Sequence, residues 1–180
     1  MPSPFEGQLI RLRAREETDL ENFYRWINDW ETVKYLGARY PRSRKFEQEW
    51  LTSGDPSFGL AQFIAETLDE ATPIAWVGLH SATPEDRAAS LGIAIGDKSH
   101  LEGGYGTDIM RTVCRFGFEM MNLHRIDLTV FDWNTRAIRC YEKVGFQHEG
   151  VLRDGMFKAG RWNQLVYMGL LRGELILEDR

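Results

Sequence analysis

The sequence predicts an α+β fold in which a mixed, mostly antiparallel central sheet is flanked by helices. Three observations favour this fold. Three consecutive strand candidates are joined by short polar loops, an apolar helix crosses over to a further strand, and two more strands end the pattern. With 180 residues, 43% of them apolar, the chain suits one compact core. We therefore expect a single domain over residues 1–180, with flexible ends at about 1–6 and 174–180.

The N-terminal part is expected to form one strand and then helices. Gln8–Arg13 alternates apolar and polar residues, which is typical of a strand. Thr18 and Glu21 have the spacing of a capping box, which predicts the start of a helix there. The apolar stripe of that helix is expected at Leu20, Phe23, Tyr24 and Ile27. A short helix over 31–36 follows, and then a helix capped by Ser43.

The middle of the chain is predicted to form an antiparallel meander. Its strand candidates are Leu60–Glu66, Ile74–His80 and Ser90–Ile95. The helix Thr107–Met121 comes next, and apolar residues cover most of its surface. Its one polar stripe consists of Asp108, Arg111, Arg115 and Glu119. We expect this stripe to face water while the rest of the helix packs on the sheet.

The C-terminal part continues with one strand, one helix and a pair of strands. Ile126–Phe131 is the strand, and Thr135–Val144 is the helix. Asn134 stands at the position of its N-cap, and Gly145 stands where a helix commonly ends in a left-handed residue. The last strands are expected at Phe146–Leu152 and Leu165–Leu171, with residues 157–162 between them.

Composition argues against several classes of protein. A net charge of −5 is unlike that of a general nucleic-acid binder, so no nucleic-acid partner is expected. No apolar stretch has the length of a membrane span and the first residues lack a signal-peptide pattern, so we expect no membrane partner and a cytoplasmic location. Cys114 and Cys140 are interpreted as small core residues, and no metal site is expected because no cysteine or histidine has ligand spacing.

A glycine-rich loop, Leu101–Thr107, precedes the apolar helix. Its glycines let backbone N–H groups approach a ligand, and the helix N-terminus behind them favours an anion such as a pyrophosphate. The spacing differs from a dinucleotide-binding fingerprint, whose third glycine would replace Ile109, and from a Walker loop, which requires a lysine. A simple glycine turn before a helix is the alternative interpretation.

A second motif, NTRAIRCYEKVGF, occupies residues 134–146. Together with the glycine loop it resembles the GNAT acetyltransferases, in which Asn, Ala, Tyr-Glu-Lys and Gly-Phe follow one another in this order. The stretch from Glu149 to Leu171 resembles the RimJ/RimL-like branch of that family. The resemblance covers nearly the whole chain and is weakest from about 31 to 59. Leu101 departs from the Gln or Arg that many members carry in the loop.

The resemblance implies a V-shaped splay between two middle strands, with acetyl-CoA as the co-substrate in the gap. It implies Tyr141 as the catalytic residue, hydrogen-bonded to the leaving thiolate, although a tyrosine on an apolar helix face can also be a core residue. Arg136 and Arg139 are further candidates for phosphate contacts. The implied cofactor-binding residues are Ile93, Ala94, Ile95, Leu101, Glu102, Gly103, Gly104, Tyr105, Gly106, Thr107, Asn134 and Lys143.

The family further implies direct attack of a primary amine on the thioester. The similarity to the RimJ/RimL-like branch makes a protein N-terminal amine the first expectation. An α-amino group has a pKa of about 7.7–8.0, so it would need little help from a base. Polyamines, aminoglycosides and other small amines are alternatives, as are a non-catalytic acyl-CoA sensor and a toxin that acetylates aminoacyl-tRNA. The candidate bases, none of them assigned, are Glu66, Asp97, Glu149 and His80.

The acceptor pocket is expected between the N-terminal helices and the last hairpin. The sequence leaves open whether it is an open groove or a closed pocket, and whether the protein is a homodimer. Aromatic residues available in these segments are Trp26, Trp30, Tyr35, Tyr40 and Phe157.

Overall fold

The computed structural model describes residues 3–53 and 57–178, in which seven strands form one sheet in the order β1-β2-β3-β4-β5-β7-β6. Neighbouring strands are antiparallel, except for the parallel pair β4 and β5. The strands are β1 (Ile10–Arg13), β2 (Leu60–Thr67), β3 (Pro73–His80), β4 (Ala88–Ile95), β5 (Arg125–Phe131), β6 (Gln147–Lys158) and β7 (Arg161–Leu171). The α-helices are α1 (Leu20–Asn28), α2 (Trp30–Val33), α3 (Arg44–Thr52), α4 (Tyr105–Glu119) and α5 (Thr135–Val144). The predicted mixed sheet with flanking helices is confirmed.

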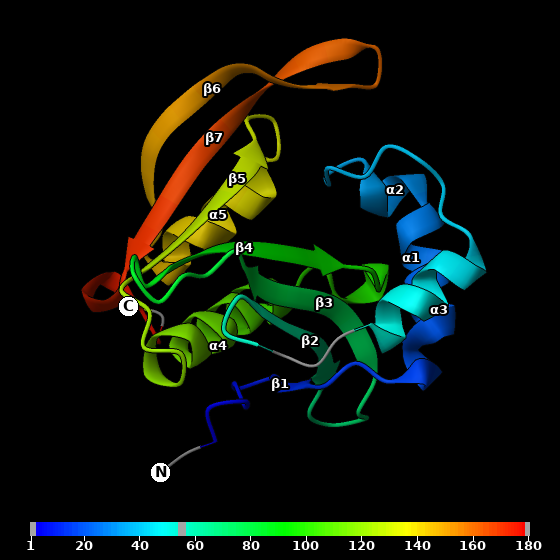
Figure 1. Ribbon diagram of the computed structural model, residues 1–180, viewed down its shortest axis with the longest axis horizontal. Helices are drawn as coiled ribbons and strands as arrows, with labels where there is room; N and C mark the ends of the chain where they lie inside the picture. The colour runs from blue at the N-terminus through cyan, green and yellow to red at the C-terminus, as the bar shows by residue number, and fades with distance from the viewer. Residues whose placement is uncertain (1–2, 54–56, 179–180) are drawn as a thin grey trace.

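Different helices cover the two faces of the sheet (Figure 1). The helix α4 packs on one face, where its Met110 and Val77 of β3 belong to the same buried core. The helix α1 packs on the other face, where the ring centroid of Phe23 lies 5.6 Å from that of Trp76. Since Trp76 and Val77 are neighbours on β3, their side chains point to opposite faces. The sheet is therefore enclosed by helices on both sides.

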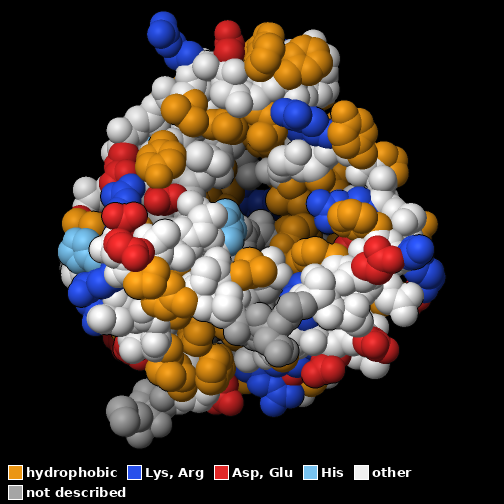
Figure 2. All heavy atoms as spheres, in the orientation of Figure 1, with side chains coloured by type: hydrophobic (Ala, Val, Ile, Leu, Met, Phe, Trp, Pro, Cys, Tyr) orange, Lys and Arg blue, Asp and Glu red, His pale blue; other side chains and the backbone are white. Residues whose placement is uncertain are grey.

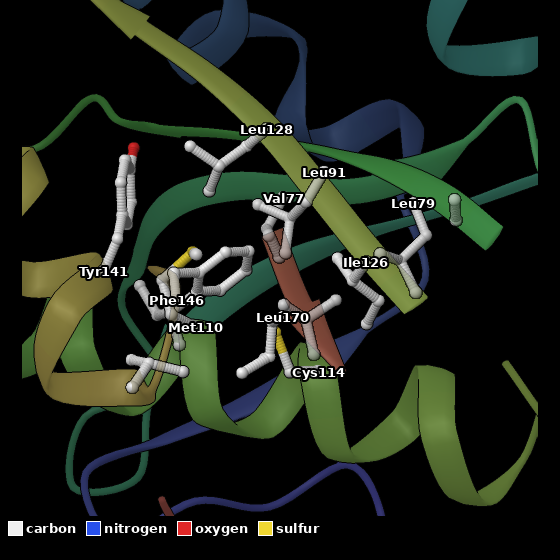
Figure 3. Packing of buried hydrophobic residues seen from close by; sticks show 14 of the residues in the cluster. Val77, Leu79, Leu91, Met110, Cys114, Ile126, Leu128, Tyr141, Phe146 and Leu170 are labelled. Carbon is white, nitrogen blue, oxygen red and sulfur yellow. The ribbon is translucent and has the colours of Figure 1, made fainter. Parts of the chain in front are cut away.

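The close approach of α4 to the sheet depends on Gly117. A Cβ atom at this position would lie 2.8 Å from Cδ1 of Leu79 and 3.1 Å from Cδ1 of Ile126, so a larger residue would force these packed side chains or the helix to shift. Figure 3 shows Met110 and Cys114 of this helix among the packed core side chains, which agrees with the interpretation of Cys114 as a core residue. Because α4 packs tightly on the sheet, the position of its N-terminus relative to β4 is fixed.

The strands β4 and β5 separate after a short paired stretch. Their register runs only from Ala88 opposite Arg125 to Ser90 opposite Asp127. Beyond this point β4 stays paired with β3 as far as Ile95, and β5 stays paired with β7 as far as Phe131. Figure 1 shows β5 rising away from β4. This is the expected V-shaped splay, and it leaves the β5-facing edge of β4 from 91 to 95 without a strand partner among the described residues.

The polar stripe of α4 differs from expectation. Instead of facing water, Asp108 and Arg111 are each only 8% exposed. The carboxylate of Asp108 accepts hydrogen bonds from the backbone N–H groups of Gln8, Leu9 and Ile10. The guanidinium of Arg111 donates to the carbonyl of Ile176. The prediction was wrong for Asp108 and Arg111, whereas Glu119 is exposed as expected, because periodicity marks the polar face of a helix but not the chain segments that cover it.

Three local predictions have different outcomes. The capping box lies earlier than expected, with Glu16 and Asp19 at the start of a 3-10 turn before α1. The cap at Ser43 is confirmed, since its hydroxyl accepts from the N–H of Phe46. Residues 157–162 are not a loop between strands, because β6 and β7 extend to a two-residue turn at Ala159 and Gly160, whose φ angles are 53° and 76°.

Both ends of the described chain make contacts. The ring of Phe5 lies 5.6 Å from that of Phe116, and the N–H of Ile176 donates to the carbonyl of Val144. Flexibility at 1–6 and 174–180 and the single-domain organisation stay predictions, and residues 1–2 and 179–180 lie outside the described residues. None of the helices that the structure describes has the length and apolar character needed to cross a membrane.

Candidate active site

A cavity of about 760 Å³ occupies the gap of the V. It is lined by β4, β5, the start of α4, one face of α5, and the segment that joins α1 to α3. Figure 2 shows a hollow near the centre of one face of the molecule, bordered mainly by hydrophobic side chains. A mostly apolar cleft with a few polar groups is typical of a site for a small molecule.

The glycine loop forms one end of this cavity. Gly103 and Gly104 have φ angles of 78° and 90°, a left-handed conformation that residues with a Cβ rarely adopt, and Gly104 is the N-cap of α4. The first N–H groups of a helix have no partner within it, and here they belong to Tyr105, Gly106 and Thr107. The donors and the dipole of α4 therefore fit a pyrophosphate.

The helix α5 adds positive charge along the wall of the cavity. Arg136, Arg139 and Lys143 all line the cavity, one helical turn apart or nearly so. Asn134 lines it as well, and its side-chain oxygen accepts from the N–H of Ala137, so the predicted role as helix cap is confirmed. A ligand with several phosphates, such as coenzyme A, matches this charge.

Tyr141 of α5 lies beside the splayed strands. It is only 9% exposed, and burial raises the pKa of its phenol well above the usual range. Figure 3 shows its hydroxyl directed away from the packed core side chains, and Tyr141 lines the cavity. A phenol in this state stays protonated at neutral pH and is suited to donate a hydrogen bond into the gap.

The structure gathers nearly all of the predicted site residues around the cavity. Gly103 and Tyr105 are the exceptions, since neither lines it, and the ring of Tyr105 packs against His100 at 4.8 Å. Helix α4 also begins at Tyr105, two residues before the predicted start. The lining residues are Ile93, Ala94, Ile95, Leu101, Glu102, Gly104, Gly106, Thr107, Asn134, Tyr141 and Lys143.

Three of the four candidate bases are engaged elsewhere. Glu66 accepts from Arg11 and Arg13, at the far side of β2. Asp97 caps a 3-10 turn, and Arg125 pairs with Glu149. Among the described residues that line the cavity, the one carboxylate belongs to Glu102 in the glycine loop.

The acceptor end of the cavity differs most from expectation. Of the aromatic residues proposed for it, Tyr35 alone lines the cavity, while Trp26 is buried beside Gly96. The other three are exposed at the surface: Trp30, Tyr40 and Phe157. Residues that the sequence did not indicate take their place: Ile27, Thr32, Leu36, Gly37, Ala38, Arg42 and Trp76. No periodic signal could have found them, since they come from three separate segments.

Comparison with known proteins agrees with this geometry. Residues 10–147 match the acetyltransferase (GNAT) domain, so the chain belongs to the GNAT family. An uncharacterised N-acetyltransferase of Bacillus subtilis, YoaA, is 26% identical over 86% of this chain and 89% of its own length. The aminoglycoside N(6')-acetyltransferase type 1 of Klebsiella pneumoniae is 28% identical over 79% of this chain and 76% of its own.

A solved structure is similar over almost the whole fold. The spermidine N-acetyltransferase of Vibrio cholerae, in complex with CoA and spermine, superposes with a TM-score of 0.85, at 25% identity, over 92% of this chain and 96% of that one. The protein is therefore an N-acetyltransferase of the GNAT type that uses acetyl-CoA.

Proposed function

We propose that the protein transfers the acetyl group of acetyl-CoA directly to a primary amine, and that the first acceptor class is an α-amine such as a peptide N-terminus. The observation that carries the proposal is the cavity itself. Its phosphate-binding end, the free edge of β4 and Tyr141 line one continuous space that also reaches the segment between α1 and α3.

Each group has a part in the transfer. Backbone groups of Ile93, Ala94 and Ile95 bind the pantetheine arm along the free edge of β4. The amine nitrogen attacks the thioester carbonyl, the carbon–nitrogen bond forms, and the carbon–sulfur bond breaks. The departing thiolate accepts a hydrogen bond from Tyr141, whose raised pKa keeps the proton on the phenol. The extra proton of the amine leaves through water.

The shortage of carboxylates favours an α-amine as acceptor. Glu102 is the one acidic residue that lines the described cavity, and it lies in the phosphate-binding loop. An amine with a pKa near 10.4 is almost fully protonated at pH 7 and needs a base, whereas an α-amine is partly neutral already. A polycation would also lack carboxylates to bind to here. The RimJ/RimL-like assignment belongs to the same proposal.

A small amine is the second candidate function. It is favoured by the similarity to proteins that are named as spermidine and aminoglycoside acetyltransferases. A non-catalytic acyl-CoA sensor is less favoured, because Tyr141 is present and lines the cavity.

Calorimetric titration followed by an acceptor screen tests the proposal. Acetyl-CoA is expected to bind one-to-one, and a peptide with a free N-terminus to be acetylated with a higher kcat/KM than spermidine or kanamycin. The same peptide with a blocked N-terminus is the control. A faster reaction with spermidine or kanamycin would instead support a small amine as the acceptor. If acetyl-CoA binds tightly but no tested amine is acetylated, the non-catalytic sensor is favoured.

A further inference from the structure

Lys158 is a buried cation at the tip of the β6–β7 hairpin. It is only 7% exposed, and no carboxylate pairs with it among the described residues. Its ammonium donates instead to the backbone carbonyls of Val33 and Ala38, at 2.5 and 2.9 Å, and to that of Leu36. A cation removed from water is tolerated only when its donors are satisfied, and here each of the three N–H bonds has one carbonyl.

The three carbonyls belong to one short segment, residues 33–38, which we name the acceptor strap. Four of its residues line the cavity: Tyr35, Leu36, Gly37 and Ala38. Val33 is the last residue of α2, and its carbonyl accepts from the N–H of Leu36 as well as from Lys158. Apart from this end of α2, the strap contains no helix or strand that would hold it in place.

Further contacts hold the strap from two sides. The ring of Tyr35 lies 5.4 Å from that of Trp133, and the guanidinium of Arg136 lies 5.6 Å from its centroid. On the hairpin side, a Cβ at Gly37 would lie 3.6 Å from Cε of Met156, so the strap and β6 are nearly in contact. Figure 1 shows the hairpin extending over the molecule toward α2.

The hairpin tip that carries Lys158 is itself braced. The side-chain amide of Asn163, which is 6% exposed, donates to the carbonyls of Met156, Lys158 and Arg161. Its oxygen accepts from Nε1 of Trp133 at 3.1 Å. The backbone of Lys158 is therefore fixed relative to the loop between β5 and α5. Through the hydrogen bonds of its ammonium, Lys158 in turn fixes the position of the strap.

The geometry points to Lys158 as a positioning residue that holds the acceptor strap as one wall of the acceptor site. It touches neither substrate. A methionine in its place would keep most of the side-chain length and lose all three donors. An arginine would keep the charge, but the N–H bonds of its planar guanidinium could not reach the three carbonyls in the same way as those of the ammonium.

Limited trypsin digestion and steady-state kinetics of Lys158→Met test this role. Lys34, Arg39 and Arg42 supply trypsin sites within and beside the strap. We expect cleavage there to become at least about tenfold faster, because loss of one charge-assisted hydrogen bond alone produces this factor and the methionine loses all three. The KM for the amine should rise about tenfold, with the Kd for acetyl-CoA and kcat nearly unchanged. Arg161→Met, at an exposed position of the same hairpin, is the matched control.

Unchanged cleavage of the strap in Lys158→Met, or an unchanged KM, would overturn the assignment. If that variant misfolds and fails to bind acetyl-CoA, Lys158→Arg is tested instead. Faster cleavage of the strap than in the wild type would support the role, and cleavage at the wild-type rate would reject it. The KM measurement rests on the proposed function, but the digestion does not. If the wild-type protein acetylates no tested amine, the proposed function is rejected. The digestion alone then decides whether Lys158 holds the strap.

Discussion

The two ends of the cavity are built in different ways. The cofactor end consists of two continuous stretches, residues 101–107 and α5 with its cap, and backbone N–H groups supply many of its donors. The acceptor end is assembled from the strap, Arg42 and Trp76, and a lysine more than a hundred residues away holds part of it. A backbone site needs only local conformation, whereas a wall of side chains needs distant segments to meet. Mutations at the two ends should therefore separate acetyl-CoA affinity from acceptor KM.

Tyr141→Phe should have the largest effect, because Tyr141 is the residue proposed to donate a hydrogen bond to the leaving thiolate. Loss of one hydroxyl that stabilises the leaving thiolate should lower kcat about 100-fold, in the range seen for single donors to a developing anion. The Kd for acetyl-CoA should hardly change, since the ring remains. Tyr105→Phe is the matched control, because Tyr105 does not line the cavity. Normal turnover in Tyr141→Phe would reject the donor role.

The pH dependence of kcat/KM should reveal the class of acceptor. For a peptide N-terminus, the neutral fraction rises about fortyfold between pH 6 and pH 8, for a pKa near 7.8, and then levels off. Since burial raises the pKa of Tyr141 above its usual value of about 10, its proton should not be lost below that pH. A profile that keeps rising tenfold per pH unit above pH 9 would indicate an acceptor of the polyamine type.

Gly104→Val should disturb the cofactor end alone. Gly104 has a φ of 90°, which a valine adopts only with strain, so the loop should shift and the Kd for acetyl-CoA should rise about tenfold or more. Calorimetry measures this directly. Gly150→Val is the control, because Gly150 lies in β6 and nothing approaches within 4 Å of its added Cβ. Wild-type affinity in Gly104→Val would argue against pyrophosphate at this loop.

Arg42→Gln should give the smallest effect, and at the acceptor end alone. Arg42 lines the cavity, and the acceptor KM should change by about threefold, because the glutamine keeps a polar side chain at this wall. Its guanidinium also pairs with Glu47, whose side chain is only 1% exposed, so thermal unfolding should show a loss of stability that is separate from the change in KM. Acetyl-CoA affinity should not move. Arg44→Gln, whose arginine pairs with Glu21 at the surface, is the comparison. A loss of cofactor affinity in Arg42→Gln would contradict the separation of the two ends.

The difference between the two ends also explains which site residues could be predicted. Asn134, Tyr141 and Lys143 share one helix, and their spacing places all three along the cavity. Trp76 and Arg42 carry no comparable signal, because each lies in a segment with its own local pattern. Lys158 is an ordinary polar residue in the sequence, and it becomes a buried ammonium only when the hairpin extends over the strap.

The polar residues of α4 show the same limit within a single helix. Their spacing predicted one polar face, and that face exists. Its function is to bind the segments before β1 and after β7, through Asp108 and Arg111. Periodicity identifies the polar face of a helix, but the segments that pack against this face come from distant parts of the sequence.

By itself, the sequence determined the order and type of the secondary elements, the cap at Asn134, the glycine loop and the position of Tyr141 on its helix. These features depend on residues within one or two turns of each other, where local hydrogen bonds and steric limits act. Only the tertiary structure decided how far β4 and β5 separate, which carboxylates are neutralised by arginines, and which residues form the acceptor wall. Those outcomes depend on which distant segments pack together, because burial and charge pairing are properties of the folded chain.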